Sequence, residues 1–365
     1  MMTARWDRCV VQRGLEFQQF FETYLNCPDR KVLLIAGGGF DPRATMLAQT
    51  LSKLTRPSIS AIVVREERAG SNPELRDRAD RSTEELCRII KDSSVVEIQV
   101  LASDNAPVGG REIVAALAKR DLSEFTDVVL DISALSTSIY FPAARFLYER
   151  TTQSKTANLH LVVAEEPTID RGIRGIAHDV PGPLHGFRGR FGLDNSAGAA
   201  KLWLPQLIPG KRVALDRLHR RVGPAETCPI LPFPSSEPRM ADMLVEEYRD
   251  ELIDAWEVDL RNCVYAAEND PLDLYRTTLR LNEARQRIFA EAGGSLLILS
   301  PTGSKILSVG ALLAALECDL PVVLTESVAY EVRDIDAFYA SLESLKSQSL
   351  VHVWLHTAAE QGKII

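Results

Sequence analysis

The chain has 365 residues, of which 45% are hydrophobic and 25% are charged. This length and composition are typical of a globular protein with two domains of ordinary size, and they exclude a disordered chain. The formal net charge of −8 argues against a general nucleic-acid binder, so we do not expect direct nucleic-acid binding.

The sequence lacks the usual signals of membrane insertion and secretion. No apolar run reaches the roughly 18 residues that a membrane span needs, and the first residues lack the apolar core of a signal peptide. The six cysteines are scattered without a CxxC pair. We therefore expect a cytoplasmic protein with reduced thiols, with no membrane partner and no metal site.

The N-terminal part alternates short apolar runs with helical patterns. After an amphipathic helix in the first thirty residues, apolar runs occupy 32–36, 59–64, 95–101, 128–130 and 159–163, with helical spacing near 44–54, 74–91, 110–120 and 138–150. Strands that are apolar on both faces belong to parallel sheets covered by helices. Residues 1–170 are therefore predicted to form a Rossmann-like α/β half with an N-terminal helix.

Residues 171–224 interrupt this rhythm with many glycines. Between Arg171 and Arg221 there are ten basic residues against three acids. We interpret this segment as a basic connector or flap, which is either a seat for an anionic ligand or a solvated linker.

The pattern resumes in the C-terminal part. Apolar runs at 230–233, 263–266, 296–299, 322–325 and 350–354 alternate with helical patterns. Residues 225–365 are therefore predicted to form a second Rossmann-like half, and we expect a ligand cleft between the two halves.

The two halves share three motifs in the same order, which suggests an internal duplication. Gly37–Arg43 corresponds to Pro234–Arg239, and both carry an acid-Pro-Arg triplet. Glu67 and the following Asn72-Pro73 correspond to Glu268 and the following Asp270-Pro271. The run 128–136 corresponds to 296–304.

The strand ends of the first half carry the candidate catalytic residues. Ligands of open parallel sheets bind at the carboxyl ends of the strands, where this half offers glycines, hydroxyls and carboxylates: Gly37, Gly38, Gly39, Asp41, Glu67, Asp131, Ser133 and Ser136. If the protein is an enzyme, Asp41, Glu67 and Asp131 are its expected acid–base groups, or they hold Mg²⁺ with a bound nucleotide. The glycine run lacks the dinucleotide-binding spacing, because Pro42 stands where a glycine is required.

The acid-Pro-Arg triplets allow two interpretations. Arg43 and Arg239 are candidate ligand-binding residues, because a guanidinium group grips phosphate or carboxylate through two bonds. On this interpretation, removing Arg43 weakens ligand binding without lowering the melting temperature. Alternatively, each triplet is structural: the acid caps a helix, the proline begins it and the arginine braces the turn.

The second half carries a sharper signal in Pro301-Thr302-Gly303-Ser304-Lys305, where hydroxyls, a glycine and a lysine stand at a strand-to-helix turn. This turn and the apolar helix after it resemble the CRISPR-associated Rossmann-fold (CARF) sensor domains. That resemblance covers roughly 295–325 and implies nucleotide sensing, with Thr302, Gly303, Ser304 and Lys305 contacting the ligand. Ser304 stands where those domains usually have threonine, and one glycine is missing.

Three functions are compatible with these features. The first is a protein that binds and senses a nucleotide or a nucleotide-derived anion, and passes the signal to a protein partner. The second is a nucleotide-processing enzyme, a hydrolase or glycosyl-type transferase, that uses the carboxylates of the first half. The third is a scaffold that docks another protein. Turnover of a nucleotide would separate the second from the first.

Overall fold

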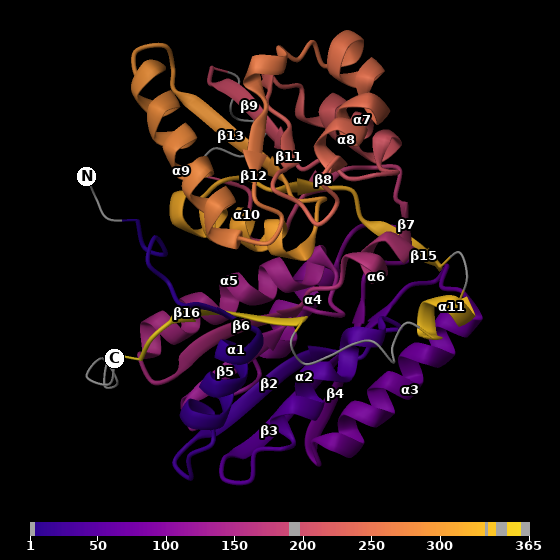
Figure 1. Ribbon diagram of the computed structural model, residues 1–365, viewed down its shortest axis with the longest axis vertical. Coiled ribbons are helices and arrows are strands. Elements are labelled where there is room, and N and C mark those ends of the chain that lie inside the picture. The colour runs from indigo at the N-terminus through magenta and orange to yellow at the C-terminus, as the bar shows by residue number, and fades with distance from the viewer. Residues whose placement is uncertain (1–3, 190–197, 333–334, 341–348, 359–365) are drawn as a thin grey trace. The chain divides into compact units, whose positions relative to one another are not determined.

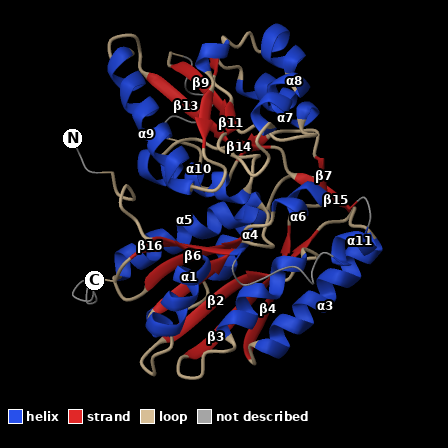
Figure 2. Ribbon diagram, viewed as in Figure 1, coloured by secondary structure: helices blue, strands red, loops and turns tan. Residues whose placement is uncertain are grey.

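The computed structural model describes residues 4–189, 198–332, 335–340 and 349–358 (Figures 1 and 2). The chain divides into two compact units. Unit A contains Arg8–Ile176 and Val328–Ile365, and unit B contains Met1–Asp7 and Ala177–Ser327.

Unit A is built on a seven-stranded sheet with the order β1-β16-β6-β5-β2-β3-β4. The five strands β2 to β6 are parallel to one another, while β1 and β16 run antiparallel to their neighbours. In order of appearance along the chain, the parallel strands are arranged 3-2-1-4-5, which is the Rossmann order. The strands are β1 (Val11–Arg13), β2 (Lys31–Gly37), β3 (Ser58–Glu67), β4 (Asp92–Gln99), β5 (Asp127–Asp131), β6 (Asn158–Ala164) and β16 (Leu350–His356).

Helices cover both faces of this sheet (Figure 1). Val32 and Leu34 of β2 belong to a core with Phe17 and Phe21, which lie on the helical segment between β1 and β2. The helices of unit A are α1 (Gly14–Phe20), α2 (Met46–Leu51), α3 (Pro73–Ile89), α4 (Gly109–Leu117), α5 (Thr137–Ser154), α6 (Pro167–Gly172) and α11 (Ile335–Ala340), with short turns η1 (Phe21–Leu25), η2 (Pro42–Thr45) and η3 (Leu122–Glu124). The predicted strands and helices of this half are thus present, although edge strand β4 is largely exposed rather than buried on both faces.

Unit B repeats the same strand order. Strand β9 (Ala200–Pro205) pairs in parallel with β10 (Glu226–Thr227) and β13 (Ser295–Ser300), and β11 (Ile230–Pro232) pairs with β12 (Val264–Ala266). Single parallel bridges join Gln206 to Ile230 and Leu299 to Val322, while β14 (Val323–Leu324) pairs antiparallel with β8 (Gly182–Pro183). Because β10 and β11 are consecutive parts of one strand, the parallel order is again 3-2-1-4-5.

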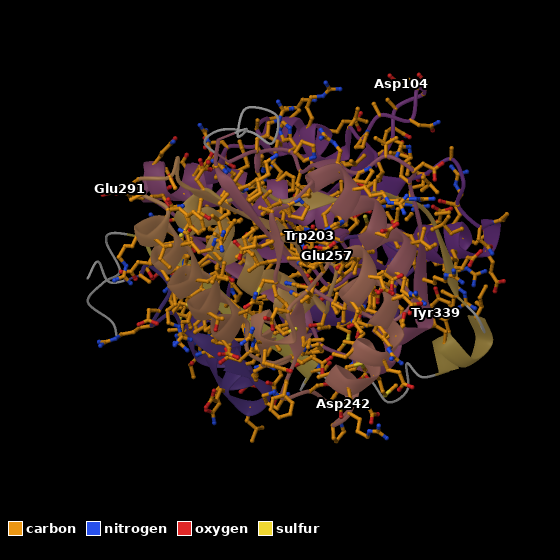
Figure 3. All side chains as sticks on the ribbon, turned by 90° about the horizontal axis from the view of Figure 1, so that it is seen from above. Asp104, Trp203, Asp242, Glu257, Glu291 and Tyr339 are labelled. Carbon is orange, nitrogen blue, oxygen red and sulfur yellow. The ribbon has the colours of Figure 1, made fainter. Side chains whose placement is uncertain are left out.

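The helices of unit B also lie on two faces. They are α7 (Arg212–Val222), α8 (Met240–Glu247), α9 (Pro271–Ile288) and α10 (Lys305–Cys318), with turns η4 (Glu251–Ala255) and η5 (Leu260–Asn262). Trp203 of β9 packs with Leu215 of α7 and Leu244 of α8 in one core, and Figure 3 marks Trp203 on its strand. A second two-stranded pair, β7 (Ile173–Ala177) with β15 (Ser327–Val332), lies where the chain passes from one unit to the other and back.

The predicted domain boundaries need correction. The segment 171–224 is not a separate flap, because β9 and α7 form the first strand and the first helix of the unit B sheet. The last strand, β16, was predicted to close the second half, but it pairs with β6 and β1 of unit A. The strands β7, β8 and β15 were not predicted at all. Part of the final predicted helix, 341–347, and the predicted basic residue Arg190 lie outside the described residues.

The shared strand order also corrects the alignment of the three motifs. Gly37 ends the first parallel strand of its sheet, whereas Pro232 ends the second. Glu67 ends the second strand, while Glu268 follows the third. Only the pair 128–136 and 296–304 joins equivalent fourth strands. Two of the three sequence matches are therefore out of register, and the duplication itself stays a prediction.

Helix starts follow the signals in the sequence. Asn72 caps α3 and Asp270 caps α9, in each case with a proline at the next position.

Among the described residues, no helix is long and apolar enough to span a membrane.

Helix α10 is buried along most of its length, as its small apolar residues predicted. It packs closely against α9: a Cβ atom at Gly310 would lie 2.5 Å from the carbonyl oxygen of Pro271 and 3.0 Å from Cβ of Leu274. Valine at position 310 would therefore force the two helices apart.

We expect Gly310→Val to lower the free energy of unfolding by about 1–3 kcal/mol. Thermal melting measures this loss. The matched control is Gly182→Val, because no atom lies within 4 Å of a Cβ at Gly182 and its φ is not positive. Equal melting temperatures for both variants would contradict the close packing of α9 and α10.

Candidate functional site

The carboxyl edge of the unit A sheet holds the buried ion-pair cluster of Arg43. Arg43 is 1% exposed. Its Nε and Nη2 donate to the two carboxylate oxygens of Asp41 at 2.9 and 2.7 Å, and Nη2 also lies 2.7 Å from Asp170. Its Nη1 donates to the carbonyl oxygen of Ala164 at 3.3 Å. Burial lowers the pKa of Arg43, but the two carboxylates outweigh it and raise the pKa, so the guanidinium stays charged.

This cluster supports the structural interpretation of the first triplet. The Asp41 side chain accepts from the backbone N–H of Arg43 and caps η2, which begins at Pro42. The guanidinium group is already held by two carboxylates, so its geometry gives no opening to a ligand. The expectation that removing Arg43 spares the melting temperature is at odds with this burial.

The glycine run packs against the protein itself. A Cβ at Gly37 would lie 2.9 Å from the carbonyl carbon of Ala134, and one at Gly38 would lie 2.3 Å from Oγ1 of Thr83. None of Gly37, Gly38 and Gly39 has a positive φ. At Gly37 and Gly38 the missing side chains therefore allow close contacts within unit A rather than a left-handed backbone.

The loop after β5 is similarly engaged. Asp131 is 1% exposed and accepts from the backbone N–H of Ser133 at 2.9 Å. The Ser133 hydroxyl oxygen accepts from the backbone N–H of Ala164 at 2.8 Å. Ser136 is half-buried, and its backbone N–H donates to Glu66 at 2.7 Å. These bonds join the ends of β3, β5 and β6 to one another.

The third predicted catalytic carboxylate, Glu67, lies in a network of arginines. It is within 3.5 Å of Arg65 and 3.4 Å of Arg76, and Arg65 also pairs with Asp80 at 2.8 Å. Asp41, Glu67 and Asp131 thus lie at one sheet edge, but two are buried and two are ion-paired. Their arrangement is that of groups that join strand ends.

A returning segment of the chain contributes further side chains near this edge. The Tyr339 hydroxyl of α11 donates to the carbonyl oxygen of Phe40, and Arg78 of α3 lies 4.1 Å from the centre of the Tyr339 ring. Tyr330 of β15 lies 5.4 Å from the ring of Phe40. Figure 1 shows α11 beside α3, and Figure 3 labels Tyr339. No pattern in the sequence predicted that the chain from Val328 onward would return to unit A.

The carboxyl edge of unit B contains the predicted phosphate turn. Its strands β9 and β13 are first and fourth, so their ends lie at the switch point of the sheet, where ligands of such sheets bind. The Thr302 hydroxyl donates to the carbonyl oxygen of Gln206, and the backbone N–H of Gly303 donates to Oε1 of Gln206 at 3.0 Å. Nε2 of Gln206 in turn donates to the carbonyl oxygen of Leu307 at 3.1 Å.

Gln206 is the residue that the sequence did not reveal. It is 1% exposed and follows β9, which was predicted to be part of a connector. A Cβ at position 303 would lie 2.7 Å from Oε1 of Gln206, which accounts for Gly303. Gln206 thereby fixes the turn that begins α10.

The helix α10 begins directly in this turn. The Ser304 hydroxyl oxygen accepts from the backbone N–H of Leu307 at 3.3 Å and caps the helix, and Lys305 is half-buried in its first turn. A helix of fourteen residues presents a positive dipole end here. The hydrogen bonds of Thr302, Gly303 and Ser304 described above are made within the protein and hold the turn, and Lys305 supplies the charge.

The predicted residue Arg239 lies on the same sheet edge, after β11. It is exposed and, among the described residues, makes no ion pair. The second triplet is thus unlike the first: no side-chain bond caps α8, and Arg239 does not brace the turn.

Three basic residues of the connector are paired with acids. Arg212 lies 2.8 Å from Glu251, Arg217 lies 3.0 Å from Asp179, and Arg220 lies 2.7 Å from Asp216 on the same helix. These ion pairs favour the interpretation of the segment as solvated chain over its interpretation as a binding site for an anionic ligand.

The described residues hold no cluster of metal ligands, and two of the cysteine thiols have a raised pKa. Within the described ranges, no three His, Cys, Asp or Glu side chains gather as a metal would require. Burial raises the pKa of the Cys228 thiol to about 12, and it also raises the pKa of Cys263. These thiols stay protonated at neutral pH and are poor nucleophiles.

Comparison with known proteins assigns the chain to no family. No protein-family model matches the chain, and no curated protein matches it. Among solved structures, the N-terminal domain of human METTL16 in complex with SAH is 10% identical over 44% of this chain and 63% of that chain, with a TM-score of 0.24.

Two further structures share a longer alignment. A proposed UDP-N-acetylglucosamine 2-epimerase from Listeria monocytogenes is 9% identical over 74% of each chain, with a TM-score of 0.23. Phytolacca americana UGT2 complexed with UDP-2fluoro-glucose and pterostilbene is 8% identical over 86% of this chain and 83% of that chain, with a TM-score of 0.23. Scores this low carry no argument about the site, so the class stated here, α/β with two Rossmann-ordered sheets, rests on strand order.

Proposed function

We propose that this protein binds a nucleotide or a nucleotide-derived anion at the carboxyl edge of the unit B sheet, and that it acts as a sensor. One observation carries the proposal: Gln206 holds the Thr302–Gly303 turn at the switch point of a Rossmann-ordered sheet, directly before the start of α10. Ligands of such sheets bind at this point, and phosphate favours a helix N-terminus.

The groups of this edge suit a phosphate. The dipole of α10 and the ammonium group of Lys305 both favour negative charge, and the turn needs no rearrangement because Gln206 and Ser304 already fix it. The proposal includes a Mg²⁺ ion that binds together with the phosphates of the nucleotide. The sensing role follows from the resemblance of this turn to CARF domains, and a protein partner that reads the bound state belongs to the same proposal.

Catalysis by the first-half carboxylates has less support. Asp41 is bonded to Arg43, Glu67 lies near two arginines, and Asp131 accepts from a backbone N–H. A general acid or base must lie within hydrogen-bond distance of the proton that it transfers to or from the substrate. Two of these three side chains are buried, which does not favour that role.

The test is a panel of ATP, GTP, NAD and cyclic oligonucleotides, measured for binding by calorimetry and for conversion by chromatography. We expect binding of at least one member without conversion, and a loss of about tenfold in affinity or more in Lys305→Ala, since hydrogen bonds to charged groups contribute about 1.5–3 kcal/mol. The matched control is Lys119→Ala, an exposed lysine of unit A. Equal affinities of Lys305→Ala and wild type would overturn the assignment, and conversion would favour the enzyme.

A further inference from the structure

Two aromatic rings are exposed where the second and third strands of unit B end. Phe233 directly follows β11 and is 56% exposed, and Tyr265 in the middle of β12 is 55% exposed. Their ring centres lie 6.2 Å apart with an angle of 80° between the ring planes. The two rings thus form a corner, in which a flat group that stacks on one ring meets the edge of the other.

The backbone holds this corner in place. The N–H of Phe233 donates to the carbonyl oxygen of Ala266 at 2.8 Å, and the N–H of Glu268 donates to that of Pro234 at 2.9 Å. The Glu268 carboxylate accepts from both the N–H and the hydroxyl of Ser236, at 2.8 and 3.0 Å. Four hydrogen bonds therefore join the two strand ends, and the rings are presented by a fixed scaffold.

Polar groups beside the rings remain available. Both bonds of Glu268 go to Oε2, so within the described chain its Oε1 has no hydrogen-bond partner. The same holds for the Tyr265 hydroxyl among the described residues. Arg239, which directly precedes α8 on the same sheet edge, is exposed. An acceptor and a hydroxyl at two exposed rings, with an exposed cation at the start of the next helix, match a base, a sugar hydroxyl and a phosphate better than they match a purely apolar surface.

We propose that Phe233 and Tyr265 bind the base of the nucleotide by stacking, with Glu268 accepting from a ribose hydroxyl. This inference rests on the proposed function, because it places the base on the same sheet edge as the phosphate turn at Pro301–Lys305. The ligand is then a nucleotide rather than a free phosphate. Base–aromatic stacking tolerates any base, so the corner selects for the presence of a base and not for its identity.

The experiment compares ATP with inorganic tripolyphosphate, which carries phosphates but no base. We expect Phe233→Ala and Tyr265→Ala each to weaken ATP binding about 5- to 150-fold, the range that corresponds to about 1–3 kcal/mol of stacking. Tripolyphosphate binding should stay unchanged in both variants. Phe233→Trp should bind ATP at least as well as wild type, since the stacking surface is kept.

The matched control is Ile288→Ala, which removes another exposed apolar side chain, 73% exposed, from α9. Both aromatic side chains lie on the surface, so the melting temperatures of these variants should match that of wild type. If ATP binding depends on Lys305 but not on Phe233 or Tyr265, the base site is wrong and the proposed function stands. If neither ATP nor any other nucleotide of the panel binds to wild type, both proposals fall.

Discussion

Replacing Arg43 with alanine is expected to lower the free energy of unfolding of unit A by about 3–5 kcal/mol, the usual cost of removing one partner from a buried ion pair. The variant leaves the carboxylates of Asp41 and Asp170 without the guanidinium that lies 2.7 Å from each. It also removes the bond to the carbonyl oxygen of Ala164, so the ends of β2 and β6 lose a shared contact.

Urea unfolding followed by circular dichroism measures this loss. The matched control is Arg88→Ala: its side chain is 78% exposed and pairs with Glu85 one turn away, so we expect a change within about 0.5 kcal/mol. A second variant separates charge from packing. Adding Asp41→Asn to Arg43→Ala should recover part of the stability, because it removes one of the two unpaired carboxylates. Wild-type stability in Arg43→Ala would restore the ligand-binding interpretation of this residue.

The local part of the fold could be predicted from the sequence. Apolar runs such as Val32–Ala36 became strands, and the Asn72-Pro73 and Asp270-Pro271 signals became helix starts. These features depend on neighbours along the chain, through period, capping and the fixed φ of proline. The small apolar residues of α10 likewise predicted a helix buried along most of its length.

Pairings between distant segments could not be predicted in this way. Strand β16 is apolar and short, and nothing in its residues distinguishes the edge of one sheet from that of the other. Strand β9 lies in a segment rich in glycine and basic residues, so its apolar run was assigned to a connector. Missing β9 shifted the first two of the three motif matches by one strand, which is why Gly37 was matched to the end of a second strand rather than a first.

The candidate site was predicted by residue type but not by bonding state. The sequence placed polar residues at strand ends correctly, because that follows from topology. Whether a carboxylate faces a ligand or an arginine depends on contacts such as Asp170 with Arg43, which join residues 127 positions apart. Gln206 was missed for the same reason: its role arises only where β9 and β13 come together.

A buried histidine pair at the other end of the unit A sheet makes the second large prediction. His160 of β6 and His352 of β16 are at most 1% exposed, and their nitrogens lie 2.9 Å apart. His160 also lies 3.1 Å from the Asp127 carboxylate, and His352 lies 3.0 Å from the side-chain oxygen of Gln12 on β1. This chain of bonds crosses from β5 through β6 and β16 to β1.

The charges around the pair set its response to pH. Burial lowers the pKa of His352 well below its usual range, and the neighbouring His160 adds to this. Burial opposes the charged form of Asp127, but the bond and charge of His160, with Thr126 and Arg30, outweigh it and lower the pKa of Asp127. Tyr24 also donates to Asp127 at 3.0 Å, and the ring of Phe20 stacks on His352 at 4.7 Å.

Unit A is therefore expected to lose stability as the pH falls below about 6.5, the usual pKa of a histidine in an unfolded chain. Below that pH, His352 becomes protonated in the unfolded state but stays neutral in the folded state, where the ring is buried. The free energy of unfolding therefore falls by up to about 1.4 kcal/mol per pH unit. Below about pH 4 the lowered pKa of Asp127 adds a second loss of the same sign.

Amide hydrogen exchange of β6 and β16 at pH 7, 6 and 5, corrected for intrinsic rates, measures this loss of stability in unit A alone. His352→Gln should flatten the dependence between pH 7 and 5, since glutamine has no proton to gain and its side-chain amide can still hydrogen-bond to His160. The control His219→Gln, in unit B, should leave the exchange of β6 and β16 unchanged. A slope that persists in His352→Gln would place the acid sensitivity elsewhere in the unit.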